Sequence, residues 1–323
     1  MRSFLRVAAA LSALSFAVPA VAADSYPSRT VKLIVPFGAG GPADVYARFL
    51  AKYLSDETKQ SFVVEDRPGA GSVIGTDAVA KSTPDGYTLL VMSNTHTVNE
   101  TLLPKKPFVL MRDFLPVASI NSSDLLMVVH PSVPAKNLKE LLALARAKPG
   151  TLNFGSSGPG SNYHMAAELL KHLTGIDIVH VPYKGSTGMR TDILSGQIQM
   201  LFDSVPTMAA LIKAGQVRAL GTSGEKRSPI LPDVPTLAEA GVPGFQATLW
   251  VGFMAPAGTP MPIVEKLNAE ITKIVSRPDI KAAWEKQGAE PVKMTQPQFK
   301  AFMDAQIAKW ADVIKANNIK AIN

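Results

Sequence analysis

A strand-like apolar run, a glycine-rich turn and a helical pattern follow one another repeatedly along this sequence. Residues 31–35 (VKLIV) are mostly apolar, residues 36–44 read PFGAGGPAD, and residues 45–54 place apolar side chains on one face of a helix. The succession restarts at residues 152–162, where LNF runs into GSSGPGSN. This alternation predicts an α/β fold with parallel strands, helices on both faces, and ligands beyond the carboxyl ends of the strands.

The first glycine-rich turn has the composition of an anion site. Gly38, Gly40 and Gly41 leave the backbone N–H groups open to a ligand, and Pro42 suits the first helical position because its missing N–H would have no partner there. The N–H groups and the positive end of the helix dipole then face one pocket. The alternative is a turn that only reverses the chain. Two such turns, in two units that restart separately, favour ligand binding.

Two further segments follow predicted strands. The strand at residues 87–92 ends at the polar residues Ser93, Thr95 and His96, which would lie at a carboxyl edge. His96 is either a ligand contact or a structural hydrogen-bonding residue. The turn at residues 67–75 spaces its glycines as G-x-G-x-x-x-G, which is not the dinucleotide fingerprint, and we interpret it as mainly structural.

The regular alternation breaks near residues 116–124 and near residues 241–248. We expect the chain to cross between two lobes at both places. Residues 24–120 and 246–323 would then form lobe 1, and residues 121–245 would form lobe 2. Two crossing strands make a hinge, and a ligand would bind in the cleft between the lobes.

Residues 1–23 have the pattern of a secretory signal peptide. Arg2 and Arg6 supply a basic n-region, residues 7–18 an apolar h-region, and the small residues around Ala22-Ala23 a cleavage site. The h-region is too short to span a bilayer. We therefore expect export to the periplasm, with cleavage near Ala22-Ala23.

The composition argues against several classes of function. The chain has no cysteine, which rules out disulfides, thiolate metal sites and a lipid-modified N-terminal cysteine. Its formal net charge is +7, or +5 without Arg2 and Arg6, and the basic residues are scattered, so we expect no nucleic-acid partner. The sequence contains no P-loop, nucleophile elbow or zinc-like histidine pair. We expect no metal, no cofactor and no catalytic residue.

Motifs along the whole mature chain resemble those of the Bug family, the periplasmic substrate-binding components of tripartite tricarboxylate transporters. They include PFGAGGPAD at residues 36–44, DRPGAG at 66–71, DGYTLL at 85–90, HVPYKG at 180–185 and QMLFD at 199–203. The resemblance implies a two-lobed type II periplasmic binding protein (Venus flytrap) with two parallel-rich doubly wound sheets and a two-strand hinge. Its ligand would carry a carboxylate.

The resemblance also implies a set of site residues. The first-lobe loop would grip one carboxylate through backbone groups and bridging waters, second-lobe turns would close over it, and Asp203 would contact the distal end of the ligand. Asp44 should cap the N–H groups of the loop and point away from the pocket, because a free carboxylate would repel an anion. Pro36, Pro42 and Asp44 are expected to shape the site. The expected ligand-binding residues are Phe37, Gly38, Ala39, Gly40, Gly41, Ser93, Thr95, His96, Ser157, Ser161, Asn162, Tyr183, Lys184, Gly185 and Asp203.

We therefore expect a monomeric periplasmic receptor that captures a di- or tricarboxylate or an aromatic acid and delivers it to the membrane permease subunits of such a transporter. Two alternatives stay open, an exported enzyme that acts on a small acid and a sensor lobe that reports to a signalling partner. Residues 186–189 (STGM) depart from the family pattern where the distal pocket is expected, so the identity of the acid is left open.

Overall fold

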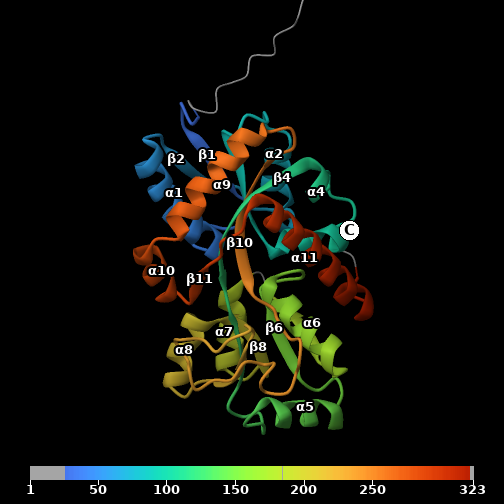
Figure 1. The fold of residues 1–323 in the computed structure, drawn as a ribbon. Coiled ribbons are helices and arrows are strands. Elements are labelled where there is room, and N and C mark those ends of the chain that lie inside the picture. Colours follow the sequence, from blue (N-terminus) through green and yellow to red (C-terminus); the bar gives the residue numbers. More distant parts are fainter. Residues whose placement is uncertain (1–25, 184, 321–323) are drawn as a thin grey trace, which may run out of the picture.

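The computed structural model describes residues 26–183 and 185–320 of the chain. These residues form two α/β lobes, each built on its own sheet and placed one above the other (Figure 1). The expected signal peptide, its cleavage site and Lys184 lie outside the described residues. Within the described part, no helix is both long enough and apolar enough to cross a membrane.

The first sheet, sheet A, has six strands in the order β11-β4-β10-β3-β1-β2. Strand β1 pairs in parallel with β2 and β3, whereas β10 is antiparallel to both β3 and β4, and β11 is antiparallel to β4. The strands are β1 (Val31–Val35), β2 (Phe62–Asp66), β3 (Thr88–Ser93), β4 (Phe114–Ser123), β10 (Leu249–Pro256) and β11 (Ala289–Pro291). The helices of this lobe are α1 (Pro42–Thr58), the 3-10 helix η2 (Ala70–Ser72), α2 (Val73–Ala80), α3 (Asn94–Leu102), α4 (Leu110–Asp113), α9 (Met261–Val275), α10 (Pro278–Glu285) and α11 (Gln296–Ala316).

The second sheet, sheet B, has five strands in the order β7-β6-β8-β5-β9. Strand β6 is parallel to β7 and β8, and β5 is antiparallel to β8 and β9. Both sheets are therefore mixed, and the predicted two-lobed α/β fold is confirmed. The strands are β5 (Leu125–Val129), β6 (Asn153–Ser156), β7 (Val179–Pro182), β8 (Met200–Ser204) and β9 (Arg218–Thr222). The helices are α5 (Leu138–Ala147), α6 (Asn162–Thr174), α7 (Ser186–Leu194) and α8 (Val205–Lys213).

The central strands are apolar because helices cover both of their faces. Leu33, Val91 and Phe253 in sheet A, and Phe154 and Phe202 in sheet B, have no exposed surface. A strand buried on both faces reads as a continuous apolar run, which is why residues 31–35 and 89–92 lack clear alternation. Packing of this kind fixes the strand ends and so positions the turns that follow them.

The chain crosses between the sheets along two neighbouring paths. Strand β4 of sheet A continues into β5 of sheet B with only Asp124 between them, and the second path returns to sheet A at β10. Ser223 ties the two paths together. Its hydroxyl accepts the N–H of Leu125 at 2.8 Å, its own N–H donates to the carbonyl of Leu125 at 2.8 Å, and its carbonyl accepts the N–H of Ala247 at 3.2 Å.

Candidate functional site between the two sheet edges

Three parallel strands of sheet A end at one edge, and each is followed by the start of a helix. Strand β1 leads through residues 36–41 into α1, β2 leads through residues 67–72 into α2, and β3 runs directly into α3. Helices α1 and α2 begin without a side-chain cap. Their first N–H groups and the positive ends of their dipoles point to this edge, which therefore favours an anion.

The loop at residues 37–41 presents free backbone donors. Within the described chain, the N–H groups of Gly38 and Ala39 have no acceptor, and both residues are exposed. A Cβ added to Gly38 would meet no atom within 4 Å. Gly40 has a φ of 75°, which glycine adopts without strain, and this turns its N–H toward Asp44. The loop can therefore donate two hydrogen bonds to a carboxylate.

Asp44 supports this loop and has its charge compensated. It is the third residue of α1, and its Oδ2 accepts the N–H of Gly40 at 2.7 Å, while its Oδ1 lies 2.6 Å from Nε of Arg48. The predicted capping bond is present, and the carboxylate is turned away from the free N–H groups. Pro42 is the first residue of α1, as predicted, and Pro36 packs against Gly75 behind the loop.

His96 holds the start of α3 in place. Its Nδ1 lies 3.2 Å from the N–H of Ser93, and its Nε2 lies 3.0 Å from the hydroxyl of Thr76. The ring is 2% exposed, and burial lowers its pKa to about 4. Both ring nitrogens therefore have partners within the chain, and a ligand contact of His96 stays a prediction. Ser93 is likewise buried, with its hydroxyl accepting the N–H of Thr95 at 3.4 Å, and Thr95 is the partly exposed member of the group.

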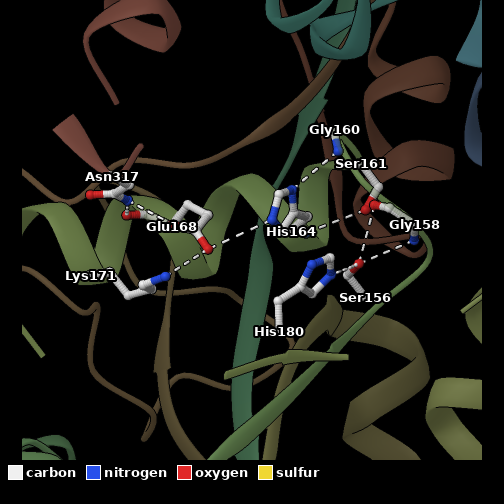
Figure 2. Close-up of polar contacts among 9 residues, drawn as sticks. All are labelled: Ser156, Gly158, Gly160, Ser161, His164, Glu168, Lys171, His180 and Asn317. Carbon is white, nitrogen blue, oxygen red and sulfur yellow. Dashed lines mark hydrogen bonds and ion pairs between the residues drawn. The ribbon is translucent and has the colours of Figure 1, made fainter. Parts of the chain in front are cut away.

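In sheet B, side chains also shape the loop that follows β6, as Figure 2 shows. The hydroxyl of Ser156 accepts the N–H of Gly158 at 3.1 Å and lies 2.6 Å from Nε2 of His180. Nδ1 of His164 accepts the N–H of Gly160 at 3.1 Å. The loop is thus held from both of its ends.

The two histidines behind this loop are neutral. His164 and His180 stack with ring centroids 4.0 Å apart, and Phe154 stacks on His180 at 4.9 Å. Burial lowers the pKa of His164 to about 3 and that of His180 to about 4. A neutral imidazole can accept an N–H without bringing charge to the loop, so both rings act as uncharged supports at neutral pH.

Three residues expected to bind the ligand lie at the start of α6. Ser161 caps the helix, with its hydroxyl accepting the N–H of His164 at 3.3 Å. Ser157 is partly exposed on the loop. Oδ1 of Asn162 is buried and has no hydrogen-bond partner, so it is an unused acceptor at this edge.

Two more expected residues precede α7. The hydroxyl of Tyr183 donates to Oδ2 of Asp192 at 2.6 Å, which uses its polar end within lobe 2. Gly185 has a φ of 144° and begins α7 without a side-chain cap. Helix α8, which follows β8, also lacks a side-chain cap. Sheet B therefore presents uncapped helix N-termini at its carboxyl edge, as sheet A does.

Asp203 is fully buried in an ion pair with Arg190. Nε of Arg190 lies 2.6 Å from Oδ2, Nη2 lies 2.9 Å from Oδ1, and the N–H of Ser204 donates to Oδ1 at 2.7 Å. The oxygens of Asp203 thus have partners within the chain and the residue has no exposed surface, and its contact with a ligand stays a prediction. Arg190 was not expected from the sequence. The sequence signal for it was its position, because Arg190 directly follows residues 186–189, which depart from the family pattern.

The two lobes contact each other at the loop after β6 and at α6. A Cβ on Gly160, in the loop after β6, would come 2.7 Å from Cδ2 of Leu102 at the end of α3. Nearby, Nδ2 of Asn317 donates to the carbonyl of Glu168 at 2.6 Å and to its Oε2 at 2.8 Å (Figure 2). The end of α3 and the C-cap of α11 in lobe 1 therefore lie against the loop after β6 and against α6 in lobe 2.

A cavity of about 210 Å³ adjoins the crossing strands. Its lining comes from both lobes and includes Asp124, Arg227 and Glu290. Among the described residues, no group of three or more histidines and acidic residues could hold a metal ion.

Two lobes joined by crossing strands, with uncapped helix N-termini along their facing edges, define a solute-binding protein. The chain belongs to the tripartite tricarboxylate transporter family receptors, since the model of that family matches residues 46–319. The resemblance found in the sequence motifs is thereby confirmed.

Relatives and solved structures match over nearly the whole chain. Protein BugT of Bordetella pertussis is 39% identical over 302 residues, which cover 93% of either chain. The structure described as R. palustris Rpa4515 with adipate has a TM-score of 0.82 and 36% identity, covering 92% of this chain and 100% of that one. MatC from Rhodopseudomonas palustris with bound malate has a TM-score of 0.77 and 32% identity, covering 90% of this chain and 100% of that one.

Proposed function

We propose that this chain is a periplasmic receptor that binds a small organic acid between its lobes and delivers it to a membrane permease. The observation that carries the proposal is the pair of free N–H groups at Gly38 and Ala39, placed at an uncapped helix start opposite the helix starts of sheet B. Two solved relatives hold the dicarboxylates adipate and malate, which supports this class of ligand. The proposed lobes are residues 24–120 with 246–323, and residues 121–245.

The binding mode follows from the donors at the edges. One ligand carboxylate accepts from Gly38 and Ala39, and donors of lobe 2 complete its shell when the lobes close. Three or four charge-assisted hydrogen bonds at about 1.5–3 kcal/mol each offset much of an association cost of about 4–15 kcal/mol. A net free energy of about −8 kcal/mol corresponds to a Kd of about 1 μM.

Binding without turnover is the expected activity. The relatives are solute-binding proteins rather than enzymes, which supports a receptor over an exported enzyme. The family description as a transporter receptor supports permease subunits as partners. We propose a monomer, because the two facing edges are both supplied by one chain.

The unfolding midpoint of the purified protein tests the proposal. Protein prepared from the periplasm is refolded from denaturant to remove ligand, then heated with mono-, di- and tricarboxylates, aromatic acids and amino acids. A ligand at about one hundred times its Kd adds about 2.7 kcal/mol, which raises the midpoint by a few degrees. One class of acid should raise the midpoint, and no response to any acid would contradict the proposal.

Gly38→Val is the matched variant for this experiment. The space around a Cβ at Gly38 is empty and its φ lies outside the left-handed region, so the unfolding midpoint without ligand should stay unchanged. The branched side chain would cover the free N–H groups, so the shift produced by the acid should be lost. Ala308→Val, on an exposed position of α11, should keep it. An unchanged shift in Gly38→Val would exclude this loop as the site.

A further inference from the structure

A cluster of three polar side chains lies at the carboxyl edge of sheet B outside the loops described above. Arg190 comes from α7, Asp203 from the end of β8, and Tyr163 from the first turn of α6. Arg190 and Asp203 form a two-bond ion pair, and burial together with the charge of Asp203 raises the pKa of the Tyr163 hydroxyl, which places that hydroxyl near the pair. The binding mode proposed above makes no use of this cluster.

The helices that supply the cluster cover opposite faces of the sheet. A Cβ on Gly155 would lie 3.2 Å from Cβ of Met189 in α7, whereas the preceding residue of β6, Phe154, stacks on His164 of α6. Neighbouring residues of a strand point to opposite faces, so α6 and α7 are separated by the sheet, as Figure 1 also shows. Asp203 is the last but one residue of β8, so side chains from both helices come together where this strand ends. The cluster therefore lies at the carboxyl edge of sheet B.

The geometry fixes the guanidinium and leaves part of it free. Asp203 accepts from Nε and Nη2 of Arg190 at 2.6 and 2.9 Å, which uses two of the five N–H donors of an arginine. The side chain of Arg190 is 31% exposed, whereas that of Asp203 is 0% exposed. Asp203 is thus the buried member of the pair. The outer side of Arg190 is its exposed part, and the N–H groups that do not donate to Asp203 belong to Nη1 and Nη2.

The surroundings favour an anion on that outer side. The negative charge of Asp203 is buried, neutralised and bonded to the N–H of Ser204. Helices α7 and α8 both begin at this edge without side-chain caps, so their positive dipole ends add to the guanidinium. A fixed planar guanidinium suits a carboxylate, which can accept from it with both oxygens.

We propose that Arg190 binds the second carboxylate of a diacid ligand and that Asp203 positions Arg190 for it. This inference rests on the proposed function, in which the first carboxylate binds at Gly38 and Ala39. It makes Arg190 the residue that selects diacids over monoacids and over ligands with a distal ammonium group. In this proposal the residue that contacts the distal end of the ligand is the cationic Arg190. Family resemblance implied that contact for Asp203.

Calorimetric titration of the refolded protein tests the selection. The probes are the straight-chain diacids from succinate to suberate, each with its half-amide, which keeps one carboxylate and the same length. Arg190→Gln should raise the Kd of the diacid that binds most tightly by at least tenfold. The Kd of the half-amide of that diacid should stay within about threefold of its wild-type value. Arg227→Gln is the matched control, because Arg227 is an ion-paired arginine of the same lobe, bonded to Glu239, and it should change neither.

A second variant guards against a folding defect. Arg190→Gln alone leaves the carboxylate of Asp203 buried without its partner, which destabilises a protein strongly. The double change Arg190→Gln with Asp203→Asn removes both charges together. It should fold and show the same selective loss for the diacid.

The outcomes separate this inference from the function on which it rests. A loss of affinity for the diacid alone, in both variants, supports the proposed role of Arg190. An equal loss of affinity for the diacid and the half-amide, or no loss for either, overturns that role but leaves the proposed carboxylate receptor standing. Wild-type protein that binds none of the acids overturns both.

Discussion

At the residue scale, buried polar side chains fix the loops and leave backbone donors free. Asp44 accepts the N–H of Gly40, His96 that of Ser93, and His164 that of Gly160. Ser93 and Gly160 are buried, so their N–H groups would otherwise be left without a partner, at a cost of about 1–3 kcal/mol. Residues whose chemistry suggests a ligand contact therefore support the backbone that we propose makes the contact.

Three histidines, the buried His96 and His164 and the half-buried His180, predict a loss of stability in acid. The pKa of His96 and His180 is lowered to about 4 and that of His164 to about 3, from an ordinary value of 6.5. Between pH 6.5 and about 4 these histidines bind protons in the unfolded chain and stay neutral in the folded chain. The free energy of unfolding therefore falls as the pH falls. Each group contributes at most about 1.4 kcal/mol per pH unit. Asp124, whose pKa burial raises to about 6, acts in the opposite direction.

A histidine variant isolates this effect. Denaturant unfolding between pH 7 and pH 4.5 gives the slope of the free energy of unfolding against pH, which reports the protons taken up on unfolding. This slope should be smaller for His180→Gln than for wild type, by the equivalent of up to one proton. His172→Gln, exposed on the same helix as His164, should keep the wild-type slope. A wild-type slope in His180→Gln would contradict a His180 that stays neutral over this pH range.

Some of this residue-level detail was predictable and some was not. The capping role of Asp44 follows from local spacing, because a residue three positions into a helix can reach the loop before it. The pairing of Arg190 with Asp203 could not be predicted, because it joins α7 and β8, whose relative placement the sequence does not state. Once paired, Asp203 loses the free lone pairs that a ligand contact would need.

At the element scale, α6 connects the loop that follows β6 to lobe 1. Its first turn holds the loop through His164, and its middle carries Glu168, which is 3% exposed. Glu168 accepts from Lys171 at 3.0 Å and from Asn317, the C-cap residue of α11, at 2.8 Å (Figure 2). This contact between α6 and α11 joins the two lobes beside the proposed site.

Removing Asn317 should therefore weaken the fold. Asn317→Ala deletes two hydrogen bonds, one of them to the buried carboxylate of Glu168, and should lower the free energy of unfolding by about 1.5–3 kcal/mol. Denaturant unfolding at pH 7 measures the change. Lys315→Ala, at an exposed position two residues earlier, is the control and should stay within about 0.5 kcal/mol of wild type. Equal stabilities of the two variants would contradict the contact.

Elements with apolar periodicity were the predictable ones. Strand β1 and helix α1 form where the sequence places them, since an apolar run and an amphipathic face need no further context. Helix α3 was missed because its sequence NTHTVNETL is largely polar. It forms because Ser93 and His96 together make a capping box, and its few apolar residues, such as Val98 and Leu102, are buried.

At the scale of the whole molecule, both lobes contribute to the proposed site. Each sheet ends in uncapped helix N-termini, and a short crossing at Asp124 joins the two lobes. The parallel parts of both sheets were predicted from the alternation of strand and helix. The antiparallel strands β5 and β10 were not, because they are the strands that enter a lobe from the other one, and their direction depends on the crossing.

Calorimetric titration of the refolded protein with the acid that raises its unfolding midpoint most, and with the neutral amide of that acid, tests the central claim most directly. The two molecules share length and shape and differ in charge. We predict one acid bound per chain with a Kd of about 1 μM and no measurable binding of the amide, because the edges offer N–H donors and positive dipole ends. Binding of the amide as tightly as the acid would contradict a carboxylate receptor built from these edges.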